Sequence, residues 1–138
     1  MLEARVVETI AAGIDKVWPV ISNFRGISPG PGIDAVDYEG DGVGMTRHIK
    51  TPNGTIVERL ESLDDNAYSF SYAIINADGP LPFSDYSSKV NLETTGDNET
   101  TVTWVGSFNS RGVPDDKAIE IASGIYKGLI QQARKAVA

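Results

Sequence analysis

Residues 43–63, VGMTRHIKTPNGTIVERLESL, contain the strongest local folding signal in the chain. Apolar and polar residues alternate on both sides of Asn53-Gly54, and a period of two is typical of β-strands with one buried face. Asn-Gly is a preferred dipeptide of two-residue type I′ turns, so the stretch predicts a β-hairpin. With that turn, Arg47 would lie opposite Leu60 and would be a diagonal neighbour of Glu58.

One face of this hairpin would carry two charged residues among mostly apolar ones. Period-two alternation places these residues together: Met45, Arg47, Ile49, Ile56, Glu58, Leu60 and Ser62. Charged groups on an apolar face are costly unless they are paired, hydrogen-bonded or hydrated. Arg47 and Glu58 are therefore candidates for a polar anchor that holds the oxygen atoms of a ligand. The alternatives are a purely structural ion pair, or a different register that leaves both in solvent.

Working outward from the hairpin, periodicity predicts seven strands and two helices. The strands are expected at 2–10, 34–40, 43–51, 55–63, 67–76, 84–95 and 99–110, and the helices at 14–24 and 115–136. Residues 26–32, GISPGPG, are too rich in glycine and proline for a regular element. Successive hairpins give a curved antiparallel sheet, and the long helix needs an apolar surface to cover. We expect an α+β fold with this helix in the concave face, above either a solid core or a cavity.

Composition limits the kinds of function. The 138 residues are 41% hydrophobic and fit a single domain spanning 1–138. The chain has no cysteine, which excludes disulfides, iron–sulfur clusters and thiol nucleophiles, and its one histidine predicts neither a metal site nor a Ser-His-Asp triad. A net charge of −7 argues against general nucleic-acid binding. No signal peptide or bilayer-length apolar run is visible, so we expect a cytoplasmic protein without a cofactor or integral membrane association, as a monomer or homodimer.

Several short motifs carry a family resemblance over essentially the whole chain. They are Ile14-Asp15-Lys16-Val17-Trp18 with Phe24, Gly42-Val43-Gly44, Glu58-Arg59-Leu60 with Leu63-Asp64-Asp65, residues 80–88 (PLPFSDYSS) and Ile125-Tyr126-Lys127-Gly128-Leu129. Their order resembles the START-like, birch-pollen-allergen-like (SRPBCC) superfamily, and within it the polyketide cyclase/dehydrase and lipid-transport type. The resemblance implies a helix-grip fold: a seven-stranded curved antiparallel sheet wrapped around the C-terminal helix, with one or two short helices after the first strand.

The sequence is more distantly similar to the plant abscisic acid receptors of the same superfamily. Glu58-Arg59-Leu60, Leu63-Asp64-Asp65, Tyr86 and Ser88 match residues that line the hormone pocket there. The receptors' gate loop is shortened here to 51–55, their His-Arg-Leu latch reads Leu81-Pro82-Phe83, and their carboxylate-binding lysine has no clear match. The resemblance therefore implies a shared pocket position without a closing lid.

Further candidate residues lie on the later strands. Tyr68, Phe70, Tyr72, Ile74 and Asn76 share one face; aromatics at this spacing are typical of plain core, yet Tyr72 and Asn76 could offer hydrogen bonds inside an apolar cavity. Tyr86 and Ser88 share a face of the next strand, with an exposed edge as the alternative. Leu81 and Phe83 are apolar residues in a loop, which indicates a cavity rim, a contact with a partner, or a plug at the end of the sheet.

The long helix carries an unusual line of small residues. Glu120, Gly124 and Gly128 follow one another at intervals of four, and each helical glycine costs about 1 kcal/mol relative to alanine. Close packing on the sheet or space for a ligand would explain this cost. The family resemblance implies that this line faces the cavity.

These observations support three hypotheses of function. The first is binding, or transport, of a small hydrophobic, lipid-like or polyketide-like ligand. The expected site is Arg47, Ile49, Glu58, Leu60, Tyr72, Ile74, Asn76, Leu81, Phe83, Tyr86, Ser88, Glu120, Gly124 and Gly128. The second is a cofactor-independent cyclase or dehydratase in which Arg47 stabilises an enolate and Glu58 moves a proton. The lack of a histidine in the site makes this enzyme the less favoured reading. The third is an accessory protein with a vestigial cavity and a contact surface at Leu81 and Phe83.

Overall fold

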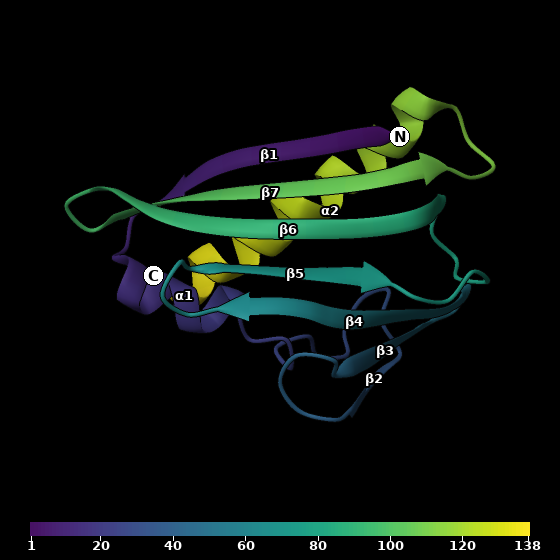
Figure 1. The fold of residues 1–138 in the computed structure, drawn as a ribbon, viewed down its shortest axis with the longest axis horizontal. Helices are drawn as coiled ribbons and strands as arrows, with labels where there is room; N and C mark the ends of the chain where they lie inside the picture. Colours follow the sequence, from purple (N-terminus) through teal and green to yellow (C-terminus); the bar gives the residue numbers. More distant parts are fainter.

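Seven antiparallel strands form one curved sheet in the computed structural model, which describes all residues 1–138 (Figure 1). The strands are β1 (Leu2–Ile10), β2 (Ala35–Glu39), β3 (Thr46–Thr51), β4 (Gly54–Asp64), β5 (Ser69–Ile74), β6 (Phe83–Gly96) and β7 (Glu99–Ser110). Their spatial order is β1-β7-β6-β5-β4-β3-β2, so every connection from β2 to β7 joins neighbouring strands, while β1 pairs with β7. The predicted helix-grip architecture is confirmed.

Two helices complete the fold. The long helix α2 (Asp115–Ala136) runs across one face of the sheet, and the short helix α1 (Ile14–Ile21) lies near the C-terminal end of α2 (Figure 1). The buried residues of α2 are mostly small, which brings its axis close to β1 and β7; they are Ala118, Ala122, Tyr126, Ile130 and Ala133. Neither helix combines the length and apolarity that crossing a bilayer requires.

Aromatic side chains fill much of the space between α2 and the sheet. Trp104 stacks on Tyr126, with ring centroids 5.5 Å apart and an angle of 17° between the planes. Phe83 and Phe108 pack with centroids 4.6 Å apart. Buried aromatic pairs of this kind contribute about 0.5–1.5 kcal/mol beyond the burial of their area. These aromatic side chains therefore form a large part of the packed core between α2 and strands β6 and β7.

The central hairpin differs from its predicted register. Thr51 pairs with Gly54, so Pro52 and Asn53 form the loop and Arg47 lies directly opposite Glu58. The side chain of Thr51 stabilises this turn, because its hydroxyl accepts a hydrogen bond from the Asn53 amide at 3.2 Å and donates to the Gly54 carbonyl at 2.8 Å. The predicted turn at Asn53-Gly54 was wrong by one residue.

The alternation along β4 also breaks before its end. The pairing with β5 shifts between Leu60 and Ser62, and this irregularity turns Ser62 away from the concave face. Ser62 is exposed and its hydroxyl shares a hydrogen bond with that of Ser71 at 2.5 Å. The prediction that Ser62 shares the face of Arg47 and Glu58 was therefore wrong.

Candidate functional site

A cavity of about 330 Å³ lies between α2, strands β3 to β6 and the segment that precedes β2. We call it the central cavity. Most of its lining is apolar, and its residues are Ile27, Gly32, Ile33, Arg47, Ile49, Thr51, Ile56, Glu58, Tyr72, Ile74, Leu81, Phe83, Tyr86, Ile125 and Leu129. Arg47 and Glu58 are the only charged side chains among them.

Arg47 and Glu58 form a buried ion pair at the wall of this cavity. Arg47 Nε donates a hydrogen bond to Glu58 Oε1 at 2.7 Å, and the two side chains are only 8% and 10% exposed. The pair forms because both residues occupy opposed positions of β3 and β4 and point to the concave face. The sequence predicted that these two residues share a face as diagonal neighbours; the structure places them on one face, with direct rather than diagonal pairing.

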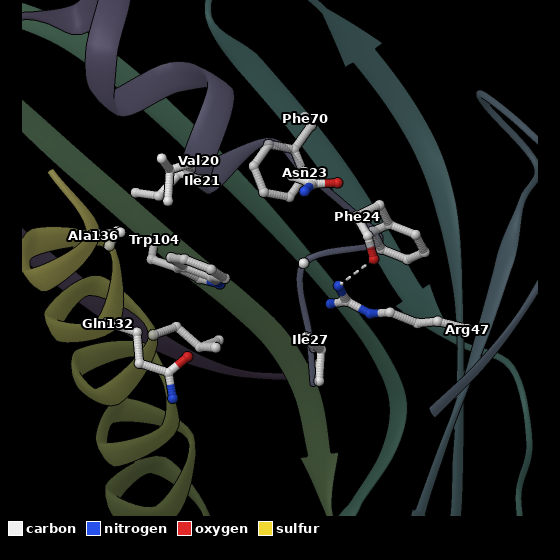
Figure 2. A pocket seen from close by; sticks show the side chains of 13 residues that line it. Val20, Ile21, Asn23, Phe24, Ile27, Arg47, Phe70, Trp104, Gln132 and Ala136 are labelled. Carbon is white, nitrogen blue, oxygen red and sulfur yellow. Dashed lines mark hydrogen bonds between the residues drawn. The ribbon is translucent and has the colours of Figure 1, made fainter. Parts of the chain in front are cut away.

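The segment after α1 holds the guanidinium group of Arg47 from the other side. Arg47 Nη1 donates to the carbonyl oxygen of Phe24 at 3.1 Å, and the guanidinium carbon lies 3.9 Å from the centroid of the Phe24 ring (Figure 2). Cation–π contacts at such distances are favourable, particularly where water is excluded. Tyr38 on β2 fixes the same segment by donating its hydroxyl to the Ile27 carbonyl at 2.8 Å.

Both members of the ion pair retain unused hydrogen-bonding capacity. Arg47 uses two of its five N–H donors on protein acceptors, which leaves three, including both on Nη2. Glu58 Oε2 accepts no hydrogen bond from the protein. No side-chain nitrogen or oxygen that is wholly inaccessible lacks a partner, so these free atoms have accessible surface. Both residues line the central cavity, so these free groups adjoin that space.

Three buried tyrosines, Tyr72, Tyr86 and Tyr126, form a second polar group that we call the tyrosine cluster. The hydroxyls of Tyr86 and Tyr126 share a hydrogen bond of 2.5 Å, and Trp104 Nε1 donates to the Tyr72 hydroxyl at 3.2 Å. Burial raises the pKa of all three phenols above the usual value for tyrosine, and that of Tyr86 well above it. The cluster therefore stays protonated at neutral pH and presents neutral hydroxyls beside the cavity.

A second cavity of about 280 Å³, which we call the end cavity, opens near the C-terminal end of α2 (Figure 2). Its lining residues are Val20, Ile21, Asn23, Phe24, Gly26, Ile27, Arg47, Phe70, Trp104, Leu129, Gln132, Ala133 and Ala136. It shares Ile27, Arg47 and Leu129 with the central cavity, so the guanidinium group lies between the two spaces.

Eight of the fourteen residues expected at the site line the central cavity. They are Arg47, Ile49, Glu58, Tyr72, Ile74, Leu81, Phe83 and Tyr86. An irregularity in β6 between Ser84 and Ser87, with Asp85 at a φ of +52°, turns Phe83 and Tyr86 to the same face. Leu81 is half-buried and Phe83 is buried, so neither is an exposed tip for a protein contact.

Three more expected residues do not line the central cavity and have other structural partners. Leu60 is buried in the hydrophobic core, and Ser88 donates its hydroxyl to the Val105 carbonyl at 3.0 Å. The side chain of Asn76 accepts a hydrogen bond from the Val57 amide at 2.9 Å and donates to the Thr55 carbonyl at 2.7 Å. Asn76 thus continues the pairing of β4 beyond the end of β5.

The prediction that the line of small residues along α2 faces the cavity was wrong. Glu120, Gly124 and Gly128 are exposed, and no atom lies near the position that a Cβ at either glycine would occupy. Burial decides the orientation of the helix, and its larger apolar side chains turn the glycine line to solvent. Ile125 and Leu129 face the central cavity instead.

Sequence reasoning also missed the contribution of the segment between α1 and β2. Ile27, Gly32 and Ile33 line the central cavity, and Phe24 supplies both a carbonyl and a ring to Arg47. A segment rich in glycine and proline has no periodicity that could assign its side chains to a face. The pattern of two isoleucines among glycines was the only available signal. No group of three or more metal-ligating side chains occurs in the structure.

A long helix gripped by a curved antiparallel sheet, with a largely apolar cavity between them, defines a protein of the helix-grip class. The chain belongs to the family described as polyketide cyclase/dehydrase and lipid transport, whose sequence profile matches residues 1–138. The comparison with curated proteins found no match.

Several solved structures have the same fold as this chain. The protein XoxI from Bacillus cereus is 30% identical, with a TM-score of 0.84 over 99% of this chain and 96% of the other. An uncharacterized protein from Bacillus thuringiensis is also 30% identical, with a TM-score of 0.82 over 99% and 98%. Ara h 8.0201 shares the fold at 16% identity, with a TM-score of 0.80 over 99% and 97%.

Proposed function

We propose that this protein binds a small, mostly apolar molecule in the central cavity, with the polar group of that molecule at Arg47 and Glu58. The observation that carries the proposal is a buried ion pair with free donors and a free acceptor at the wall of an apolar cavity. A buried ion pair is costly to desolvate and often gives no net stability over apolar side chains. A binding role would account for its presence in this position.

The size and lining of the cavity support the same function. Small-molecule sites are typically concave and mostly apolar, with a few placed polar groups, and have volumes of about 300–1,000 Å³. The central cavity, at about 330 Å³, is at the lower end of this range. We therefore expect a compact ligand rather than a complete membrane lipid.

Binding of a neutral fluorescent probe, N-phenyl-1-naphthylamine, tests the proposal. Ile125 lines the central cavity from α2 and is 37% exposed, so Ile125→Trp should obstruct the cavity with little effect on the core. Lys127→Trp adds the same side chain at an exposed position of the same helix and is the matched control. We expect the probe to bind the native protein and the control, and to bind Ile125→Trp at least about tenfold more weakly. Equal binding to all three proteins would contradict the proposal.

Cyclase-type chemistry is a second candidate, which the family description and one observation favour. The free oxygen of Glu58 and the free N–H donors of Arg47 adjoin the same cavity, as a base and an oxyanion-stabilising group would have to. Incubation with a linear polyketide-like substrate would test it. Cyclisation by the native protein that is lost in Glu58→Gln, with probe binding retained, would support an enzyme; absence of turnover with bound substrate would exclude it.

A further inference from the structure

The charges at the central cavity sum to zero. Arg47 is its only cation and Glu58 its only anion, and they already neutralise each other at 2.7 Å. The end cavity adds no charged residue, because Arg47 is again its only charged side chain. The chain as a whole carries a net charge of −7. No unpaired positive charge is therefore available to a ligand.

This balance penalises a negatively charged ligand. A carboxylate that approached the free N–H groups of Arg47 would share one guanidinium group with Glu58, and the two like charges would repel each other at short range. The site would then hold a net negative charge in largely apolar surroundings, which is costly. The negative field of the protein would also oppose the approach of an anion.

An uncharged oxygen atom meets none of these costs. A carbonyl oxygen can accept hydrogen bonds from the free N–H groups of Arg47, and bonds from a charged donor are stronger than those between neutral groups. A hydroxyl can accept from Arg47 and also donate to the free Oε2 of Glu58. The ion pair thus offers complementary partners to a neutral oxygen-bearing group.

We infer that the cavity selects ligands whose polar group is an uncharged carbonyl or hydroxyl and discriminates against carboxylates of the same skeleton. This inference rests on the proposed binding function and specifies the chemical class of ligand. Glu58 is the specificity-determining residue in this account, because its charge cancels the attraction that Arg47 would otherwise exert on an anion.

Three naphthalene compounds of similar size test this preference: 2-acetylnaphthalene, 2-naphthalenemethanol and 2-naphthoic acid. Each is titrated against bound N-phenyl-1-naphthylamine at neutral pH, where the acid is ionised. We expect the ketone and the alcohol to bind the native protein at least about tenfold more tightly than the carboxylate. A carboxylate that binds as tightly as the ketone would overturn the inference while leaving the proposed function intact. If none of the three displaces bound probe, both the inference and the proposed site fail.

Two variants distinguish the effect of the charge inside the cavity from the effect of the net charge of the protein. Glu58→Gln removes the negative charge inside the cavity and should raise the affinity for the carboxylate relative to the ketone by about tenfold or more. Glu61→Gln removes the same charge from an exposed position on the same strand, where Glu61 pairs with Arg59 at 2.9 Å. This control should leave the ratio of affinities unchanged. A folded Glu58→Gln protein with the native ratio would overturn the inference, and the comparison of ligands on the native protein stands even if this variant does not fold.

Discussion

Removing one member of the Arg47–Glu58 pair should destabilise the protein far more than removing an exposed ion pair. Arg47→Met leaves the Glu58 carboxylate without its cation, and Glu58→Gln leaves the buried guanidinium without a balancing negative charge. Both side chains are about nine-tenths buried, so neither can recover full hydration in the folded state.

The expected loss in the free energy of unfolding follows from this burial. Breaking a fully buried pair costs about 3–5 kcal/mol, and access to the cavity should reduce this to about 2–3 kcal/mol for each single variant. The double variant removes both charges, so its cost should be about that of one single variant rather than the sum. The magnitude of the coupling energy between Arg47 and Glu58 is then also about 2–3 kcal/mol. A loss of 3 kcal/mol lowers the melting temperature by roughly 10 °C for a domain of this size.

Urea unfolding of the native protein and the three variants measures these energies, provided that the transitions are two-state. The exposed pair of Lys50 and Asp37, with its atoms 2.8 Å apart, is the control and should show a coupling energy below about 1 kcal/mol. A coupling energy for Arg47 and Glu58 as small as that of the control would refute the reasoning, since it would show that the pair is effectively hydrated.

Three other predictions concern the surroundings of the site. A Cβ at Gly106 would collide with the phenol of Tyr126, so Gly106→Ala should cost about 3 kcal/mol in urea unfolding, and a cost under about 1 kcal/mol would argue against this close packing. Arg111 donates hydrogen bonds to three carbonyls of the loop at 77–83, so Arg111→Gln should speed proteolysis within that loop. An unchanged cleavage rate would show that these hydrogen bonds do not hold the loop in place. The tyrosine cluster has raised pKa values in the folded state, whereas unfolded tyrosines ionise near pH 10. As the pH rises, the unfolded state therefore loses these protons first, and the free energy of unfolding should fall by up to about 4 kcal/mol per pH unit above about pH 10. Urea titrations at a series of pH values would detect this fall. A free energy of unfolding that does not change with pH in this range would contradict the prediction.

Much of the fold could be predicted because the residue periodicity distinguishes the strands from the two helices. The alternation around Arg47 and Glu58 also placed these two residues on a common face, and the family resemblance implied that this face is the concave one. Their exact pairing could not be predicted, because Asn53-Gly54 is the stronger general turn signal and the competing hydrogen bonds of Thr51 depend on its side-chain conformation.

The helix and loop contributions were harder to predict for a different reason. Spacing alone put Gly124 and Gly128 on one line of α2, but spacing cannot say which line faces the sheet when apolar residues occupy a neighbouring one. The orientation follows from burying the larger apolar surface, which includes Tyr126 and Ile130. The hydrogen bond from Arg47 to the Phe24 carbonyl depends on how the segment after α1 folds back against β3. A backbone carbonyl leaves no mark in the side-chain pattern, so the sequence could not predict this contact.

Nuclear magnetic resonance of the isotope-labelled protein titrated with 2-acetylnaphthalene tests the central claim most directly. The account predicts intermolecular nuclear Overhauser effects from the ligand to the methyl groups of Ile49 and Leu129, together with shifts of the Arg47 Nε–H resonance. Contacts confined to the convex face of the sheet, or an unchanged Arg47 resonance at saturating ligand, would contradict it.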